Sequence, residues 1–308
     1  MIDLRRLRHF LTVADTLHFG RAAERLGMTQ PPLSQSIMAL ERDLSADLFV
    51  RSKRSVTLTP FGRAWLEHVR PAVQSIAALS DIAQRLRAGT TGRLSLAFVS
   101  TADYNVLPRL VERYSASFAD VELELIEATS DIQIEALLEG RINAGILISA
   151  PSALPAALAY RPLVTEPLVA AVPEPWIDEG RLTLIDGMLR SDDWMAQPLI
   201  IFPARVSPDF HELVMGFYRS RGYQPFIRQE AIQMQTIISL VSAGLGMALV
   251  PASLQHLIRT GVRYVHIANG TPDLETGLAW RKSDDAPTLT NLIEISSRIG
   301  RRGANDAA

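Results

Sequence analysis

Residues 19–58 read FGRAAERLGMTQPPLSQSIMALERDLSADLFVRSKRSVTL, and they open with two short helical patterns separated by a turn. The first pattern, from Arg21 to Leu26, carries the adjacent small residues Ala22 and Ala23, which allow a neighbouring helix to approach closely. Gly27 follows where a tight turn needs a permissive backbone. We therefore expect a helix-turn-helix at this point in the chain.

The second helix is predicted to begin after Thr29, a suitable N-cap, and to run to about Leu44. Prolines 31 and 32 fall in its first turn, where a missing N–H is harmless. Its buried stripe is predicted from apolar residues at helical spacing: Leu33, Ile37, Leu40 and Leu44. The polar residues at the helix start then face outward, where small and amide side chains can enter a major groove. The expected DNA contacts from this helix are Gln30, Pro31, Pro32, Ser34, Gln35 and Ser36.

A short alternating run from Phe49 to Leu58 follows and indicates a hairpin wing. Its cations, Arg51, Lys53 and Arg54, are expected to reach phosphate or the minor groove. The alternative is an ordinary helical hairpin with solvated charges. The order of turn, proline-led helix and basic wing favours a DNA-binding head.

Five stretches of the chain resemble the LysR-type transcriptional regulators, in particular the branch that senses metabolites of aromatic degradation. The first two are AAERLGMTQPPLSQSIMALERDL and LFVRSKRSVTLTPFG, and the others are AFVSTADYNVLPRLVERY, LLEGRINAGIL and LVSAGLGMALVPAS. The resemblance covers nearly the whole chain. Ser45 stands where the family often has glycine, and Gln35 where it often has arginine. The second departure changes an expected DNA contact, so the family's operator sequence does not transfer.

Charge is divided unevenly along the 308 residues, a length that fits about two domains. Residues 1–90 carry a net charge of +5 and residues 91–308 a net charge of −7, which together give −2. A basic head on an acidic body is expected when only the head meets phosphate.

Cysteine is absent, which excludes disulfides, thiolate metal sites and thiol switches. Neither a secretory signal nor a bilayer-spanning apolar run is found, so a cytoplasmic protein is expected.

A long helical pattern runs from Thr59 to about Ala88, with Pro60 at its start and Gly89 at its stop. Pro71 lies inside the pattern and is expected to kink or break the helix. The apolar stripe of this helix has to be buried, and a second copy of the chain can bury it in a coiled-coil-like pair. Packing on its own body is the alternative. A dimer could read an interrupted palindrome.

After Gly92 strands and helices alternate, which predicts an α/β layout with mainly parallel sheets. The resemblance implies two periplasmic-binding-protein-like α/β subdomains with an effector in the cleft between them. The expected fold class is α/β with an N-terminal all-α winged helix-turn-helix, a long linker helix and these two subdomains. We expect the DNA-binding domain at 1–59, the linker and dimerisation helix at 60–89 and the effector-binding domain at 90–308. Subdomain I takes about 90–165 and 269–300, and subdomain II about 166–268.

Ligands in such folds bind at the carboxyl ends of strands, beside helix N-termini. Similarity to members that sense ring-cleavage diacids implies hydroxyl contacts from Ser100 and Ser130 and walls from Phe210 and Met234. Routine helix capping and core packing are the alternatives. The neighbouring loops add Thr101, Ile148, Pro203 and Gln233 as expected effector contacts.

Two departures from those diacid sensors bear on the effector's charge. Ile148 replaces an arginine, and Ile232-Gln233 replaces an Arg-Glu pair. A buried carboxylate needs a cation or several N–H donors, so a less charged effector is expected, such as an aromatic compound or a monocarboxylate. Arg161 or Arg205 could supply a cation from elsewhere.

Catalysis is not expected, and neither is a metal or a cofactor. The six histidines lack metal-ligand spacing, and G-x-S-x-G and phosphate-loop motifs are absent. The predicted function is therefore a regulator that binds double-stranded DNA as a homodimer or homotetramer and responds to a small-molecule effector, with RNA polymerase a candidate partner. The alternatives are an architectural DNA binder, which would not need so large a body, and a metabolite-binding protein with a non-functional DNA head.

Overall fold

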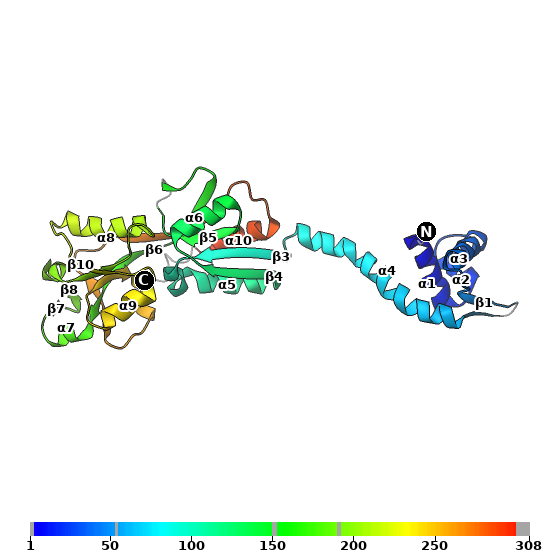
Figure 1. The fold of residues 1–308 in the computed structure, drawn as a ribbon, viewed down its shortest axis with the longest axis horizontal. Coiled ribbons are helices and arrows are strands. Elements are labelled where there is room, and N and C mark those ends of the chain that lie inside the picture. Colours follow the sequence, from blue (N-terminus) through cyan, green and yellow to red (C-terminus); the bar gives the residue numbers. More distant parts are fainter. Residues whose placement is uncertain (1–2, 53–54, 150–152, 190–191, 300–308) are drawn as a thin grey trace. The chain divides into compact units, whose positions relative to one another are not determined.

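A computed structural model describes residues 3–52, 55–149, 153–189 and 192–299 of the chain. It divides into two compact units, Met1–Gln84 and Arg85–Ala308 (Figure 1). The predicted wing cations Lys53 and Arg54 lie outside the described residues.

The first unit is the predicted helix-turn-helix with its wing. Its elements are α1 (Leu4–Thr16), α2 (Phe19–Arg25), α3 (Gln30–Leu44) and the antiparallel strands β1 (Phe49–Arg51) and β2 (Val56–Leu58). Gly27 has a φ of 64° between α2 and α3, which explains why glycine occupies this turn. The apolar stripe of α3 is buried against α1 and the start of the wing, in a cluster that includes Phe10, Leu33, Ile37, Leu40 and Leu48.

The long helix α4 (Pro60–Arg87) contains 28 residues and continues through Pro71. The expected break at Pro71 is therefore absent. Val69 and Val73, on either side of the proline, are buried in the head's core, and this packing holds the helix together where one backbone hydrogen bond is lost. At the start of α4 the backbone of Gly62 passes so close to Leu48 that a Cβ would lie 2.2 Å from the Leu48 carbonyl oxygen.

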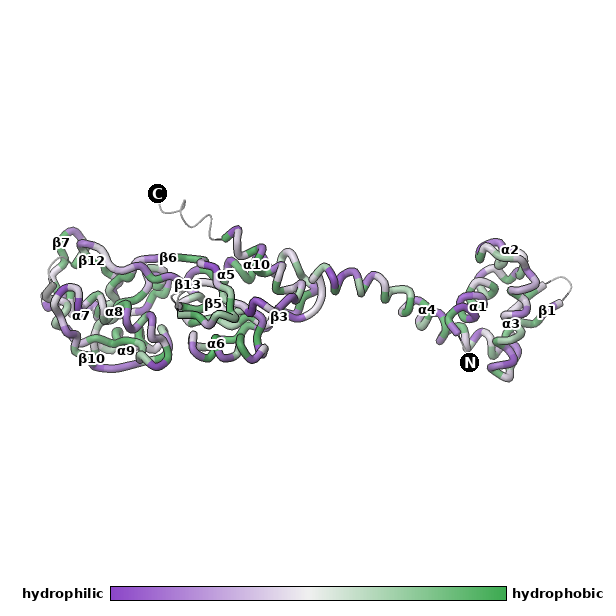
Figure 2. The backbone as a smooth tube through the Cα atoms, turned by 90° about the horizontal axis from the view of Figure 1, so that it is seen from above, coloured by the Kyte–Doolittle hydropathy of each residue, from purple (hydrophilic) through white to green (hydrophobic). Residues whose placement is uncertain are grey.

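The second unit begins with a parallel three-stranded arrangement in the order β4-β3-β5. All four residues of β5 are buried, and Figure 2 shows the hydrophobic character of this region. The elements are β3 (Thr91–Phe98), the 3-10 helix η1 (Ser100–Tyr104), α5 (Val106–Ser117), β4 (Asp120–Glu127), α6 (Ser130–Glu139) and β5 (Ala144–Leu147). The last helix of the chain, α10 (Pro287–Ile299), packs beside α5 and β3.

The other half of this unit is built on the long strand β6 (Leu158–Pro173). Its larger elements are β9 (Leu199–Ile201), α8 (Pro208–Ser220), β10 (Ile227–Glu230), α9 (Met234–Ser242), β11 (Ala248–Pro251) and β12 (Val262–Ile267). Shorter segments are α7 (Glu174–Asp178), β7 (Leu184–Ile185), β8 (Met188–Leu189), η3 (Asp192–Ala196) and η4 (Ala252–His256). The segment η4 stays a 3-10 turn, because Leu257 leaves helical geometry with a ψ of 85°.

Two neighbouring strands carry the chain between the halves. The first part of β6 pairs antiparallel with β13 (Asp273–Arg281), and its second part pairs antiparallel with β11 and β12. The resulting sheet runs β4-β3-β5-β13-β6-β12-β8-β7 and is mixed. The expectation of mainly parallel sheets is wrong, because the outgoing and returning strands run in opposite directions side by side. The predicted α/β class with an N-terminal winged helix-turn-helix is confirmed.

Candidate functional site

The start of α3 presents the polar face that the sequence predicted. Thr29 occupies the N-cap position without a side-chain hydrogen bond, and the two prolines follow in the first turn. Most of the predicted contact residues are exposed, namely Gln30, Pro31, Pro32 and Gln35, whereas Ser34 and Ser36 are half-buried. An amide and a flat proline surface are thus offered together at a helix N-terminus, an arrangement that suits base edges.

The hydroxyl of Ser36 already has a protein partner. Its Oγ lies 2.8 Å from Nδ1 of His9, a buried residue of α1. Burial lowers the pKa of His9 below the ordinary histidine value, and the charge of Arg5 lowers it further while Asp3 opposes the change. Ser36 therefore links α3 to α1.

Arg51 is held against α3. Its guanidinium donates to Glu41 Oε2 at 2.6 Å, and its Cζ lies 4.9 Å from the centroid of the Phe19 ring. The other Glu41 oxygen accepts the backbone N–H groups of Leu48 and Phe49 at 3.0 Å and 3.2 Å. Glu41 thus fixes the wing to the last turn of α3. Sequence reasoning missed it, because no local spacing rule relates residues ten positions apart.

His18 is a second residue whose role in the head becomes clear only in the fold. Its Nδ1 accepts the backbone N–H of Arg21 at 3.2 Å, which caps α2. His18 is exposed and, with Gln30 and Arg51, lines a hollow of about 440 Å³ between the helices and the wing.

A smaller cavity of about 190 Å³ lies in the second unit, where the ends of β3, β4 and β5 meet the loop before α8 and the start of α9. It is lined by the predicted effector contacts Ser100, Thr101, Ser130, Ile148 and Gln233. The structure therefore brings residues from five separate segments into one pocket.

The other three predicted contacts do not line this cavity. Phe210 is 2% exposed and packs edge-on against Phe202, with 5.5 Å between ring centroids. Met234 is fully buried, and Pro203 is buried in the loop before α8. Each has the surroundings of a core residue, and their contact with an effector remains a prediction.

The hydroxyls of the pocket differ in their partners. Ser100 Oγ accepts the Met234 N–H at 3.4 Å, and Ser130 Oγ accepts the Ile148 N–H at 3.2 Å. Thr101 is 2% exposed, and its Oγ1 is a buried atom without a hydrogen-bond partner. A buried hydroxyl without a partner is unfavourable, so Thr101 has hydrogen-bonding capacity left for a ligand.

Among the described residues that line the pocket, Glu127 is the only charged one. The Nε2 of Gln233 lies 3.5 Å from its Oε1. Neither arginine considered from the sequence lines the pocket. Arg161 donates to the Ile293 carbonyl and to Ser296 Oγ in α10, and Arg205 is exposed.

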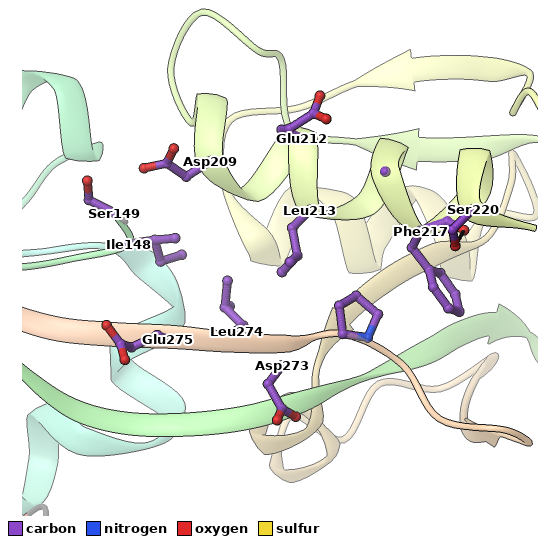
Figure 3. A pocket seen from close by; sticks show the side chains of 12 residues that line it. Ile148, Ser149, Asp209, Glu212, Leu213, Phe217, Ser220, Asp273, Leu274 and Glu275 are labelled. Carbon is purple, nitrogen blue, oxygen red and sulfur yellow. Dashed lines mark hydrogen bonds between the residues drawn. The ribbon is translucent and has the colours of Figure 1, made fainter. Parts of the chain in front are cut away.

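A larger, open hollow of about 760 Å³ shares Ile148 with this pocket, and Figure 3 shows the side chains that line the hollow. Its walls are α8 and β13, with Leu213, Phe217 and Leu274 among the apolar lining. Four carboxylates surround it: Asp209, Glu212, Asp273 and Glu275.

Across the described ranges no three histidine, aspartate or glutamate side chains are grouped so that they could hold a metal ion. The described helices also include none long and apolar enough to cross a membrane.

An exposed helix-turn-helix joined to an α/β domain with an internal pocket defines a DNA-binding transcriptional regulator. The chain belongs to the LysR family of such regulators. Residues 4–63 match the family model for the bacterial regulatory helix-turn-helix protein, lysR family, and residues 87–298 match the LysR substrate binding domain. The second match alone covers more than half of the chain.

Known regulators are similar to this chain over almost its full length. The HTH-type transcriptional regulator IlvR of Caulobacter vibrioides is 58% identical over 301 residues, which are 97% of this chain and 99% of that protein. Full-length CbnR complexed with its target DNA superposes with a TM-score of 0.84 at 27% identity, covering 97% of this chain and 100% of that one. The BenM effector binding domain with its effector benzoate gives a TM-score of 0.59 at 26% identity, covering 69% and 94%. These relatives are transcriptional regulators rather than enzymes.

Proposed function

We propose that the protein regulates transcription by reading an interrupted palindrome with two copies of the α3 surface, and that a small molecule in the pocket of about 190 Å³ controls this activity. The observation that carries the proposal is the exposed, polar start of α3, on which Gln30 and Gln35 stand free of the core. Effector binding acts by favouring one arrangement of the regulator over another.

Gln35 is the proposed base-reading residue, because its amide can both donate to and accept from adenine. Gln30, Pro31, Pro32 and Ser34 are proposed to contact DNA beside it, and Ser36 to contact it while bonded to His9. Arg51 is proposed to position the wing on α3 as well as to approach phosphate. Lys53 and Arg54 remain predicted phosphate contacts.

Pairing through α4 would supply the second DNA-binding head. The helix exposes large apolar side chains that its own chain does not cover, namely Phe61, Ile76, Leu79, Ile82 and Leu86. A second copy that covers this stripe removes it from water, which is the main driving force for association. Polar residues separate the apolar ones along α4 (Figure 2), as expected for a helix with one covered face. The assembly is a homodimer or a homotetramer.

The effector is proposed to be a compact molecule with less negative charge than a dicarboxylate, because isoleucine occupies position 148 and no described arginine lines the pocket. A small aromatic compound or a monocarboxylate fits this description, and benzoate occupies the corresponding domain of BenM. We propose a DNA-binding domain at 1–59, a linker and dimerisation helix at 60–89 and an effector-binding domain at 90–308. We also propose that the protein is cytoplasmic and has no catalytic activity.

The alternative is a metabolite-binding protein with a non-functional DNA head. Measurement of duplex DNA affinity by fluorescence anisotropy at several salt concentrations separates the two. A working head gives an affinity that falls log-linearly with salt, and Arg54→Ala lowers the slope by about one unit if Arg54 contacts phosphate. An absence of duplex binding at low salt would support the alternative.

A further inference from the structure

The pocket admits only a compact ligand. Its volume of about 190 Å³ is below the roughly 300–1,000 Å³ that is usual for the binding sites of drug-sized ligands. Much of its wall is apolar, from Val99, Ile132, Ile148, Phe202, Val206 and Ile232. One part of the ligand is therefore a small apolar group.

The start of α9 offers N–H donors beyond that of Met234, which already donates to Ser100 Oγ at 3.4 Å. Gln233, the N-cap residue, makes no side-chain cap hydrogen bond, and the first turn contains no acidic residue. The first N–H groups of a helix lack intrahelical partners and carry partial positive charge. Thr101, 2% exposed and without a hydrogen-bond partner at its hydroxyl, lines the same cavity and is an independent sign of a missing polar partner. Together these groups suit a ligand carboxylate.

The carboxylate of Glu127 favours a positively charged group on another part of the ligand. It ends β4 and is the one charged residue among the described lining of the pocket. Asp209 and Glu275 add negative charge in the hollow beyond Ile148. The other helix that begins at the pocket, α6, already has Asp131 in its first turn. A purely anionic ligand meets repulsion here, whereas an ammonium group beside Glu127 is stabilised.

We propose that the ligand is a zwitterionic α-amino acid with a compact aliphatic side chain. Its carboxylate meets the start of α9 and the Thr101 hydroxyl, its ammonium group meets Glu127, and its side chain lies against the isoleucine-rich wall. This inference rests on the proposed function, because it takes the pocket to be the effector site. It narrows the proposed monocarboxylate to one that also carries an ammonium group.

Isothermal titration of the full-length protein with three matched probes tests the proposal. The probes are L-valine, its des-amino analogue 3-methylbutanoate and its decarboxylated analogue 2-methylpropylamine. We expect L-valine to bind at least about tenfold more tightly than either analogue, since each analogue loses one charge-assisted contact worth about tenfold or more. Glu127→Gln should lower L-valine affinity about tenfold and leave 3-methylbutanoate binding unchanged or tighter. Thr101→Val should weaken L-valine and 3-methylbutanoate alike and spare the amine.

Glu122→Gln is the matched control, because Glu122 is an exposed residue of the same strand and does not line the pocket. Thermal unfolding of each variant checks that it is folded. An unchanged ratio of L-valine to 3-methylbutanoate affinity in Glu127→Gln would overturn the proposal, as would tighter binding of 3-methylbutanoate or benzoate than of any zwitterion, or no binding of the three probes. Sequence-specific DNA binding would survive each of these results, so a failure here is distinct from a failure of the proposed function.

Discussion

Glu41 and Arg51 form an ion pair with 2.6 Å between carboxylate and guanidinium, which joins the last turn of α3 to the first strand of the wing. The pair is the centre of a larger arrangement, because Glu41 also accepts two backbone N–H groups from residues 48 and 49. These contacts tie α3 and the first strand of the wing together.

Glu41→Ala should lower the stability of the head by about 2 kcal/mol, because it leaves two backbone N–H groups and one guanidinium without their partner. Differential scanning calorimetry of the full-length protein measures the effect on the unfolding of the head. Glu24→Ala, at an exposed site on α2, is the control and should have little effect. Equal melting temperatures for both variants would show that the Glu41 contacts do not stabilise the head.

Gln35→Ala should cost about 1–3 kcal/mol of operator affinity and relax the preference at one base position. Competition binding with operators that differ at single positions measures both quantities. Gln224→Ala, at an exposed site in the second unit, controls for the loss of an amide. A uniform loss of affinity on all sequences would mean that Gln35 touches the DNA backbone instead.

Gly62→Ala should destabilise the head by about 1–3 kcal/mol, because the new methyl group meets the Leu48 carbonyl oxygen at 2.2 Å and main-chain atoms have to move. Gly216→Ala is the matched helical control, since its Cβ meets only side-chain ends at 3.8 Å. It should stabilise α8 by up to about 1 kcal/mol through higher helix propensity. The melting temperatures of the two variants should therefore shift in opposite directions relative to the parent protein. Shifts of the same sign would mean that the contact at Leu48 does not decide the effect of Gly62→Ala.

The head should lose stability in mildly acidic solution because of His9. Burial lowers the pKa of His9 in the folded head, so below about pH 6.5 the unfolded chain binds this proton more readily. Stability is then full above that pH and falls as the pH decreases toward the lowered pKa. Melting temperatures measured from about pH 8 to pH 5 should show a smaller acid-side loss in His9→Gln than in the parent protein. His68→Gln, at an exposed site on α4, should retain the parent's profile, and identical profiles for all three proteins would exclude His9 as the cause.

Glu166 ties two distant segments together beside the crossing strands. Its carboxylate accepts from Asn105 Nδ2 at 2.7 Å and from the backbone N–H of Ser253 at 2.6 Å. Glu166→Ala should destabilise the second unit by about 3 kcal/mol, because hydrogen bonds to a charged group contribute about 1.5–3 kcal/mol each. Chemical unfolding provides the measurement, with the exposed Glu122→Ala as control. A loss no larger than that of the control would mean that Asn105 and Ser253 find other partners.

The fold of the head could be predicted because the residues that determine it lie close together in the sequence. The alanine pair, Gly27 and the stripe from Leu33 to Leu44 act within one or two helical turns. The strands Val262–Ile267 and Asp273–Arg281 were missed because their polar residues break the alternating pattern, and their position depends on pairing with β6 about a hundred residues away. Without them, the mixed character of the sheet could not be foreseen.

The pocket was predictable only in part. Hydroxyls at strand ends, such as Ser100 and Ser130, follow from the general geometry of α/β folds. Apolar helix residues such as Phe210 and Met234 have the same pattern whether they form a wall or a core. Glu127 could not be placed from the sequence, because its neighbour Gln233 is 106 positions distant.

Selection of binding sites from a random duplex pool by the full-length protein tests whether two copies of α3 read an interrupted palindrome. We expect an inverted repeat whose half-sites are spaced by about one helical turn, or a multiple of about 10 base pairs, and whose preference at one base position in each half-site is lost with Gln35→Ala. Enrichment without a repeated half-site, or a selected motif that is the same for Gln35→Ala, would contradict it.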